Sequence, residues 1–200
     1  EVRRTDDLPV VGTQSTYLTG HDEIHSLSQI LKIPTIRFWM GFGEHYINVF
    51  SVLKSLGLLS EQPVQLDSGQ EVVPLQLVKA VLPDPASLAP DYTGKTCIGT
   101  LLKGEKDGKT REVFLYNVCD HAETYAEIGS QAISYTAGVP AAAAALLIAD
   151  GTWDVQRMVN VEELPPLPLL RLQAGMGLPT RVREGTMDVA LEDAPEAQDA

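Results

Sequence analysis

The sequence predicts an α+β domain in which helices pack on a mainly antiparallel or mixed sheet. Three observations favour this fold class. Strand-like and helical runs alternate irregularly along the 200 residues, and the two central strand-like runs are joined by a hairpin-type turn at Asp107-Gly108. No predicted strand is followed by Gly-x-Gly-x-x-Gly, so we expect the dinucleotide-binding domain to be absent from this chain.

The first third of the chain predicts one extended segment, two helices and a strand. Residues 1–20 mix charges, Thr, Gly and Pro without sustained periodicity, which indicates an extended initial segment or linker with one edge strand. Asp22 can cap a helix over 22–31, and 35–40 is a β-rich run. Apolar residues then recur at helical spacing over 44–57.

The middle of the chain predicts a hairpin followed by two helices. Pro74 can begin a helix over 74–82, because proline is accepted in a first helical turn. Residues 96–103 and 111–118 are strand-like, and they precede a polar helix over 120–132 and an alanine-rich helix over 134–148.

The end of the chain predicts a short strand over 158–162, a short helix over 166–175 and an acidic, flexible tail over 181–200. The domain organisation is therefore an initial segment over 1–20, a substrate-binding and catalytic domain over 21–180, and the tail.

Composition narrows the classes of function. The net charge is −12 with a pI near 4.6, which argues against nucleic acid and is compatible with cationic ligands, although six of the 27 acidic residues lie between Glu184 and Ala200. The longest apolar run, Ala141–Ala149, is too short to span a bilayer, so no membrane association is expected. Two cysteines indicate a reducing compartment, and we expect a cytoplasmic protein. The start at Glu1 suggests a fragment with upstream sequence missing.

Polar residues are densest between Tyr116 and Pro140, at the end of the second hairpin strand. Such density at a strand end suits a functional site. The structural alternative is that Asp120 caps the next helix, Glu123 completes a capping box and His121 is exposed. By spacing alone this alternative is the more common.

Other chemistries at this run have weaker support. Cys119, His121 and Glu123 could hold zinc, but a fourth ligand is not evident, and we expect no metal. Cys119 would be a nucleophile only with a depressed pKa, and burial as a small apolar side chain is commoner.

Two cations elsewhere are candidate anchors for a carboxylate. Arg37 lies in a β-rich run and can present a bidentate fork, or it can pair with one of the abundant acids. Lys79 precedes Pro83-Asp84-Pro85 and can bind a carboxylate or form a Schiff base, although a surface lysine is commoner on an amphipathic helix.

Several long runs resemble the saccharopine dehydrogenase-like family, and most closely its carboxynorspermidine (carboxyspermidine) dehydrogenase branch. The matching runs are Arg37–Glu44, Val73–Pro85, Tyr116–His121, Gly129–Pro140 and Val161–Leu164. The resemblance covers about Leu8 to Pro179. It implies NADPH-dependent reduction of the imine formed between L-aspartate 4-semialdehyde and a diamine, either 1,3-diaminopropane or putrescine. NADPH would be bound mainly by a domain outside this chain.

The resemblance and the charges together suggest roles for particular residues. A dicationic diamine favours the carboxylates of Glu44, Asp120 and Glu123, whereas the α-carboxylate of the semialdehyde favours Arg37 or Lys79. The catalytic candidates are His121, as proton donor or relay, and Asp120, which would set the tautomer or the pKa of His121. Five further residues are candidates for substrate binding: Trp39, Asn117, Cys119, Gln131 and Tyr135.

Two other functions remain open. One keeps the family and changes the substrate to saccharopine or another amino-acid adduct, which needs a second cationic anchor. The other is a non-catalytic module that forms a homodimer through its sheet. In either enzyme reading the partners are small molecules, and a homodimer is expected.

Overall fold

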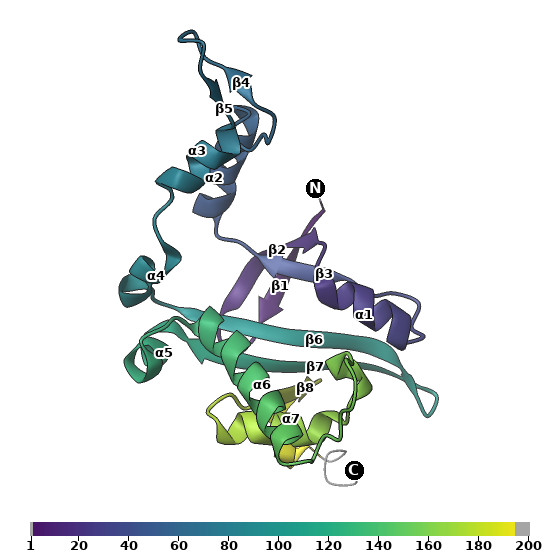
Figure 1. The fold of residues 1–200 in the computed structure, drawn as a ribbon. Helices are drawn as coiled ribbons and strands as arrows, with labels where there is room; N and C mark the ends of the chain where they lie inside the picture. The colour runs from purple at the N-terminus through teal and green to yellow at the C-terminus, as the bar shows by residue number, and fades with distance from the viewer. Residues whose placement is uncertain (1, 195–200) are drawn as a thin grey trace. The chain divides into compact units, whose positions relative to one another are not determined.

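The computed structural model describes residues 2–194 and has the predicted α+β fold (Figure 1). Contacts divide the chain into two compact units. Unit 1 holds the residues up to Asp7, then 13–20 and 37–88, and unit 2 holds 8–12, 21–36 and the residues from Ala89 onward. The chain therefore passes between the units several times: one boundary falls after Gly20, and unit 2 continues past residue 180 without a break.

Unit 1 contains a three-stranded sheet of order β1-β2-β3, formed by β1 (Arg3–Leu8), β2 (Gly12–Thr19) and β3 (Phe38–Gly41). Strands β2 and β3 pair antiparallel, with Thr16 opposite Gly41. The initial segment was expected to hold one edge strand. It holds two, because the run that ends in Thr16-Tyr17-Leu18-Thr19 finds its partner in β3.

The rest of unit 1 includes a helical arm, which we define as residues 44–82. It consists of α2 (Glu44–Ser55), a small antiparallel pair of β4 (Val64–Gln65) and β5 (Glu71–Val72), and α3 (Pro74–Val81). Both predicted helices are confirmed, and Pro74 occupies the first turn of α3. The short helix α4 (Pro85–Leu88) follows.

Unit 2 contains a four-stranded sheet of order β6-β7-β8-β9. Strands β6 (Lys95–Lys106) and β7 (Lys109–Asp120) form the predicted hairpin, which is longer than expected. Asp107 and Gly108 have φ of 54° and 71°, as a two-residue hairpin turn with positive φ at both positions requires.

Helices cover one face of this sheet. Helix α5 (His121–Ile128) continues directly from β7, and α6 (Ala132–Ala149) and α7 (Pro166–Gly175) lie over the strands (Figure 1). Val113 and Leu115 of β7 and Leu167 and Leu170 of α7 all pack against the buried cluster of Val182, Leu191 and Ala194. Unit 2 also contains α1 (Asp22–Ile30) and the short 3-10 turn Ala89–Asp91.

The segment 158–162 was predicted to be a strand, and this prediction is wrong. Residues Val161–Glu163 form a 3-10 turn instead. The Asn160 side chain accepts a hydrogen bond from the backbone of Glu163, and the Glu163 carboxylate accepts one from the backbone of Asn160. This reciprocal cap satisfies the backbone locally, so the valine-rich segment needs no neighbouring strand.

The segment 181–194 was predicted to be part of a flexible tail, and it is instead folded. Strands β8 (Arg181–Glu184) and β9 (Met187–Ala190) extend the sheet, and β8 pairs with β7 through Leu115 and Val182. The segment was predicted to be flexible because it is rich in acidic residues. In the structure Glu184 and Asp188 form ion pairs with Arg111 and Arg181, which neutralise their charges. Residues 195–200 of the predicted tail lie outside the described residues.

By length and composition, α6 could cross a membrane: its mean hydropathy is 1.7 over 18 residues, of which 22% are buried. A single helix of this kind is weak evidence, because core helices pass the same test. The apolar run considered from the sequence, Ala141–Ala149, began after Pro140, but Pro140 lies inside α6 and does not end the helix.

Candidate functional site

The end of β7 and the starts of α5 and α6 form a compact corner, defined here as residues 117–135. Cys119 packs against Ala132, Tyr135 and Leu178 in a buried cluster. Side chains two apart on a strand share a face of the sheet, so Asn117 lies on the same face as Cys119. Because Gln131 directly precedes Ala132, the corner gathers most of the polar run found in the sequence.

His121 is the first residue of α5 and is only 6% exposed. Its ring Nδ1 accepts a hydrogen bond from the backbone N–H of Ala132 at 3.3 Å, and the backbone N–H of His121 donates to the Gly94 carbonyl at 3.0 Å. The Tyr92 ring lies 5.0 Å from the imidazole. Since Nδ1 is an acceptor, the ring proton is on Nε2, and His121 is a hydrogen-bond donor through that atom.

Asp120 caps α5, as the structural alternative held. Its carboxylate accepts from the N–H groups of Ala122 at 2.8 Å and Glu123 at 3.2 Å, and it pairs with Lys95 at 3.3 Å. These hydrogen bonds, first that from Glu123, lower the pKa of Asp120. The Ala132 N–H, rather than Asp120, is the hydrogen-bond partner of the His121 ring, and an effect of Asp120 on the pKa of His121 stays a prediction. The idea that His121 is exposed is wrong.

Burial governs Cys119 and Tyr135. Desolvation, then the charges of Asp120, Glu123 and Glu127, raises the pKa of the Cys119 thiol, the opposite of what a nucleophile needs. Burial likewise raises the pKa of Tyr135, whose hydroxyl donates to the Met176 carbonyl at 2.9 Å. Both side chains therefore support the wall of the corner.

Asn117 and Gln131 each carry a buried oxygen without a donor. Asn117 Oδ1 and Gln131 Oε1 are inaccessible to solvent and accept no hydrogen bond from any residue in 2–194; Thr19 Oγ1 of unit 1 is the third such side-chain atom among those residues. Buried polar atoms in folded proteins are nearly always paired.

Glu123 lies in the first turn of α5 and is exposed. Its backbone, rather than its carboxylate, serves the Asp120 cap. The carboxylate is therefore available to a cationic ligand.

The remaining predicted site residues belong to unit 1. Arg37 is exposed just before β3, and Lys79 is exposed on α3; neither forms an ion pair with another described residue. Trp39 lies on β3 with the Arg4 guanidinium 4.0 Å from its ring centroid, and Glu44 is the exposed first residue of α2. The structure thus brings the unit 2 candidates together, and a cleft that they share with the unit 1 candidates stays a prediction.

A shallow surface hollow of unit 2 lies elsewhere. It is lined by Asp22, Glu23 and His25 of α1 together with Ser26, Asn160 and Glu162. Ser26 donates to Glu162 at 2.8 Å, so these polar groups serve each other.

The described residues do not fit a dinucleotide or a metal. The glycine pair Gly41-Phe42-Gly43 leads into α2, whose first turn carries Glu44, and a carboxylate there opposes a pyrophosphate. Among residues 2–194, no three His, Cys, Asp or Glu side chains are placed to hold a metal ion.

Comparisons with known proteins agree with the earlier resemblance. Residues 2–178 match the saccharopine dehydrogenase C-terminal domain. The chain belongs to this family. It is 47% identical over 178 residues to carboxynorspermidine synthases of Vibrio alginolyticus and Vibrio cholerae, and 48% identical over 181 residues to a carboxyaminopropylagmatine dehydrogenase of Synechocystis.

Each alignment covers 89% of this chain but only 43% to 45% of the relative, so the chain spans less than half the length of these relatives. The saccharopine dehydrogenase-like resemblance stated from the sequence is confirmed.

Three residues that contact His121 or Asp120 in the corner were not predicted from the sequence. Gly94, Tyr92 and Lys95 hold His121 and Asp120 through a carbonyl, a ring contact and an ion pair. One of them, Lys95, could have been found from the predicted hairpin. In the antiparallel register Lys95 lies opposite Asp120.

Proposed function

We propose that this chain is the substrate-binding domain of an NADPH-dependent reductase of polyamine biosynthesis. The reaction is reduction of the imine formed between L-aspartate 4-semialdehyde and 1,3-diaminopropane or putrescine, which gives carboxynorspermidine or carboxyspermidine. The observation that carries this proposal is the 47% identity to two proteins named carboxynorspermidine synthase. The names of all three relatives support an oxidoreductase of this pathway.

The geometry supports the proposal at the corner. An imine is reduced as a protonated iminium, so a proton donor is needed beside the nitrogen. The Nε2–H of His121 can donate a hydrogen bond to the imine nitrogen or to the water that protonates it, and nearby carboxylates favour a cationic substrate. Arg37 and Lys79 are exposed cations and stay predicted anchors for the α-carboxylate.

NADPH supplies the hydride when it is bound. Because the described residues do not form a phosphate site, we assign NADPH to a part of the protein outside them. We further propose a cytoplasmic homodimer, in line with the acidic composition and the two free cysteines.

A second amine substrate has support from one relative. The Synechocystis protein is named for carboxyaminopropylagmatine and is as similar to this chain as the Vibrio proteins are. Agmatine is therefore a candidate amine. Saccharopine remains the alternative within the family, and a non-catalytic dimerisation module the alternative outside it.

The test uses the full-length protein. Oxidation of NADPH is followed with L-aspartate 4-semialdehyde and, in turn, 1,3-diaminopropane, putrescine, agmatine and lysine, and products are identified by mass spectrometry. Carboxynorspermidine or carboxyspermidine formation is the expected result. Turnover with lysine alone favours the saccharopine alternative, and no turnover with any amine overturns the proposal.

The role of His121 is tested with a matched pair of variants. His121→Asn keeps an acceptor for the Ala132 N–H but lacks the Nε2 donor, so turnover should fall by about 10²- to 10⁴-fold while the fold is retained. His121→Gln keeps a donor near Nε2 and should retain more activity. Equal activity of His121→Asn and the unaltered enzyme removes the role.

Arg37→Lys tests the carboxylate anchor. Loss of the bidentate fork should raise the KM for the semialdehyde more than the KM for the amine. An unchanged semialdehyde KM contradicts the assignment of Arg37.

A further inference from the structure

We infer that Tyr92 is a positioning residue for His121: its ring holds the imidazole in the orientation that presents the Nε2–H. The inference rests on the proposed function for the use of that N–H. It goes further by assigning a role in the reaction to the residue that follows the 3-10 turn Ala89–Asp91.

The backbone of His121 is held independently of its ring. The backbone N–H donates to the Gly94 carbonyl at 3.0 Å, and the carbonyl accepts from the Thr124 hydroxyl at 3.1 Å. These bonds fix where the residue lies at the start of α5, but the imidazole can still turn about its side-chain bonds. The direction of Nε2 therefore depends on the groups that touch the ring.

The Ala132 N–H holds one nitrogen of the ring. It donates to Nδ1 at 3.3 Å, which is longer than most hydrogen bonds from an N–H group in proteins. A long hydrogen bond sets the tautomer but is a weak restraint on the plane of the ring. A second contact has to supply that restraint.

Tyr92 supplies the second contact. Its ring centroid lies 5.0 Å from that of His121, and the two planes are inclined at 53°. Tilted rings at such a separation attract each other, because the electropositive edge of one faces the electronegative face of the other. This attraction opposes rotation of the imidazole, so the Nε2–H keeps one direction.

The exposure of Tyr92 argues against a role confined to the core. The tyrosine is 43% exposed, whereas the histidine that it contacts is 6% exposed. The Tyr92 hydroxyl makes no hydrogen bond with another residue among 2–194. The hydroxyl is therefore dispensable for the proposed role, and the ring is what a conservative variant must keep.

The variants separate the ring from the hydroxyl in the full-length protein. Tyr92→Leu removes the ring, and Tyr92→Phe removes only the hydroxyl. Tyr92→Met also lacks the ring and covers the case in which Tyr92→Leu does not fold. Tyr46→Leu is the matched control, because Tyr46 is 53% exposed and stacks on Phe42 and Phe50 rather than on a histidine.

The first measurement needs no turnover. Nitrogen NMR is recorded on the free enzyme with isotope-labelled histidine at alkaline pH, where histidine is neutral, and the His121 signals are assigned by their absence from His121→Asn. We expect a pyridine-like Nδ1 and a pyrrole-like Nε2 in the unaltered protein, in Tyr92→Phe and in Tyr46→Leu. In Tyr92→Leu both signals should move toward the average of the two tautomers, because a loosely held ring exchanges between them.

The second measurement is steady-state kinetics with L-aspartate 4-semialdehyde and the amine that the full-length protein prefers. Tyr92→Leu should lower kcat by about 10-fold with unchanged KM values, since a misdirected donor serves the reacting nitrogen poorly while substrate binding is unaffected. Tyr92→Phe and Tyr46→Leu should retain the kcat of the unaltered enzyme.

The two measurements together decide the inference. A spectral change and a loss of kcat in Tyr92→Leu, with neither in Tyr92→Phe, support it. Unchanged spectra in Tyr92→Leu overturn it, and so does a spectral change with unchanged kcat or a Tyr92→Phe variant that behaves like Tyr92→Leu. If the unaltered enzyme turns over none of the amines, the proposed function fails, and the spectra alone decide whether Tyr92 holds the ring.

Discussion

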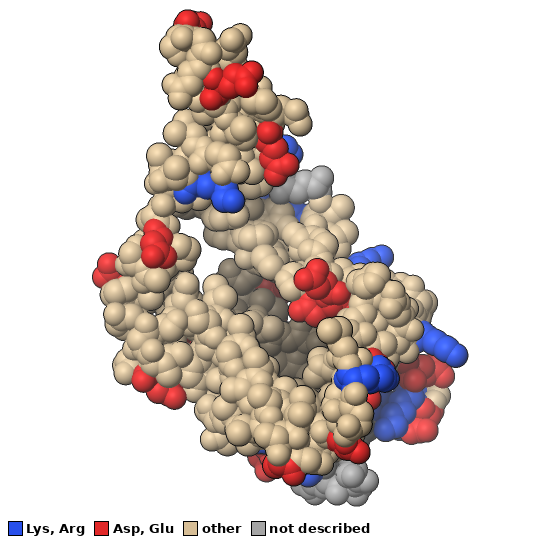
Figure 2. Space-filling view, in the orientation of Figure 1, with Lys and Arg blue, Asp and Glu red and all other residues tan. Residues whose placement is uncertain are grey.

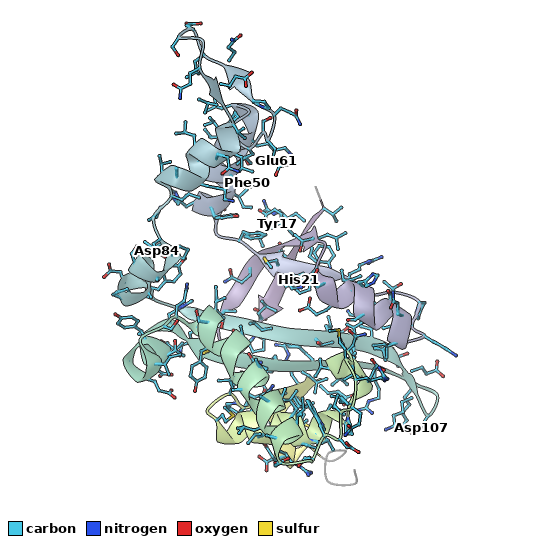
Figure 3. The ribbon with its side chains drawn as sticks, viewed as in Figure 1. Tyr17, His21, Phe50, Glu61, Asp84 and Asp107 are labelled. Carbon is cyan, nitrogen blue, oxygen red and sulfur yellow. The ribbon has the colours of Figure 1, made fainter. Side chains whose placement is uncertain are left out.

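The corner of unit 2 and the arm of unit 1 contrast in how they use their side chains. In the corner, His121, Thr124 and Tyr135 are buried polar residues, each with a hydrogen-bond partner. In the arm, α2 buries no residue, and Tyr46 and Phe50 are 53% and 44% exposed. Figure 2 shows acidic and basic side chains on the arm among uncharged ones, and Figure 3 labels Phe50 and Glu61 there.

This contrast shows that a helical spacing of apolar residues predicts a helix but does not predict that the helix is buried. In α2 the period made a helix without an enclosed core, and the rings of Phe42, Tyr46 and Phe50 stack on each other along its side. In the corner, a mixed polar and apolar run became buried because β7, α5 and α6 surround it. Periodicity predicts the helix, whereas the number of neighbouring elements determines burial.

The largest expected effect comes from replacing a leucine by alanine beside the corner and, for comparison, in the arm. Leu178→Ala removes a side chain that is 1% exposed and should lower the free energy of unfolding by about 3 kcal/mol. Leu77→Ala in the arm, where the leucine is 52% exposed, should change it by less than about 1 kcal/mol. Chemical denaturation measures both. Equal losses would show that the arm has a core like that of the corner.

The next effect tests the sheet beneath the corner. A Cβ on Gly99 would lie 2.4 Å from the Leu115 carbonyl oxygen and 2.7 Å from Phe114 and Tyr116, so Gly99→Ala should cost about 2 kcal/mol. Gly104→Ala on the same strand meets no atom within 4 Å and serves as the control. Thermal unfolding should separate the two variants, and similar midpoints would contradict the tight packing.

A smaller effect compares one hydroxyl in each region. Tyr135→Phe removes the hydrogen bond to the Met176 carbonyl and should cost about 1 kcal/mol. Tyr46→Phe in the arm removes an exposed hydroxyl with no hydrogen-bond partner among residues 2–194, and it should be neutral. If denaturant midpoints of both variants match that of the unaltered protein, the Tyr135 hydroxyl is not a structural contact.

The smallest effect concerns the cap of α5 and depends on pH. The folded pKa of Asp120 lies below the ordinary 3.8, so the charged form stabilises the fold fully above that value. The contribution is lost as the pH falls through the lowered folded pKa. Asp120→Asn should therefore be less stable than the unaltered protein at pH 7, with the gap closing under acid. A gap that is constant from pH 7 to pH 2 excludes this role.

Much of the fold could be predicted from local chemistry. Asp107-Gly108 predicted the hairpin turn, and both residues adopt the positive φ that this turn requires. Pro74 and Pro83 predicted the two ends of α3, because proline is accepted at the start of a helix and not within it. The N-terminal cap of α5 was predicted from Asp120, which directly precedes the helix. Strands β8 and β9 were not predicted. Their acidic residues are neutralised by Arg111 and Arg181, and these arginines lie outside the acidic stretch or at its edge.

The sequence by itself determined the fold class, the family resemblance and the polar run from Asn117 to Tyr135, because each depends on residue types and spacing along the chain. Only the tertiary structure decided what these residues do to each other. It placed the Ala132 N–H on His121, left Asn117 Oδ1 and Gln131 Oε1 without a donor among residues 2–194, and buried Cys119. Tautomer, burial and unmet hydrogen bonding depend on which backbone groups approach a side chain, and that is settled by packing rather than by order in the chain.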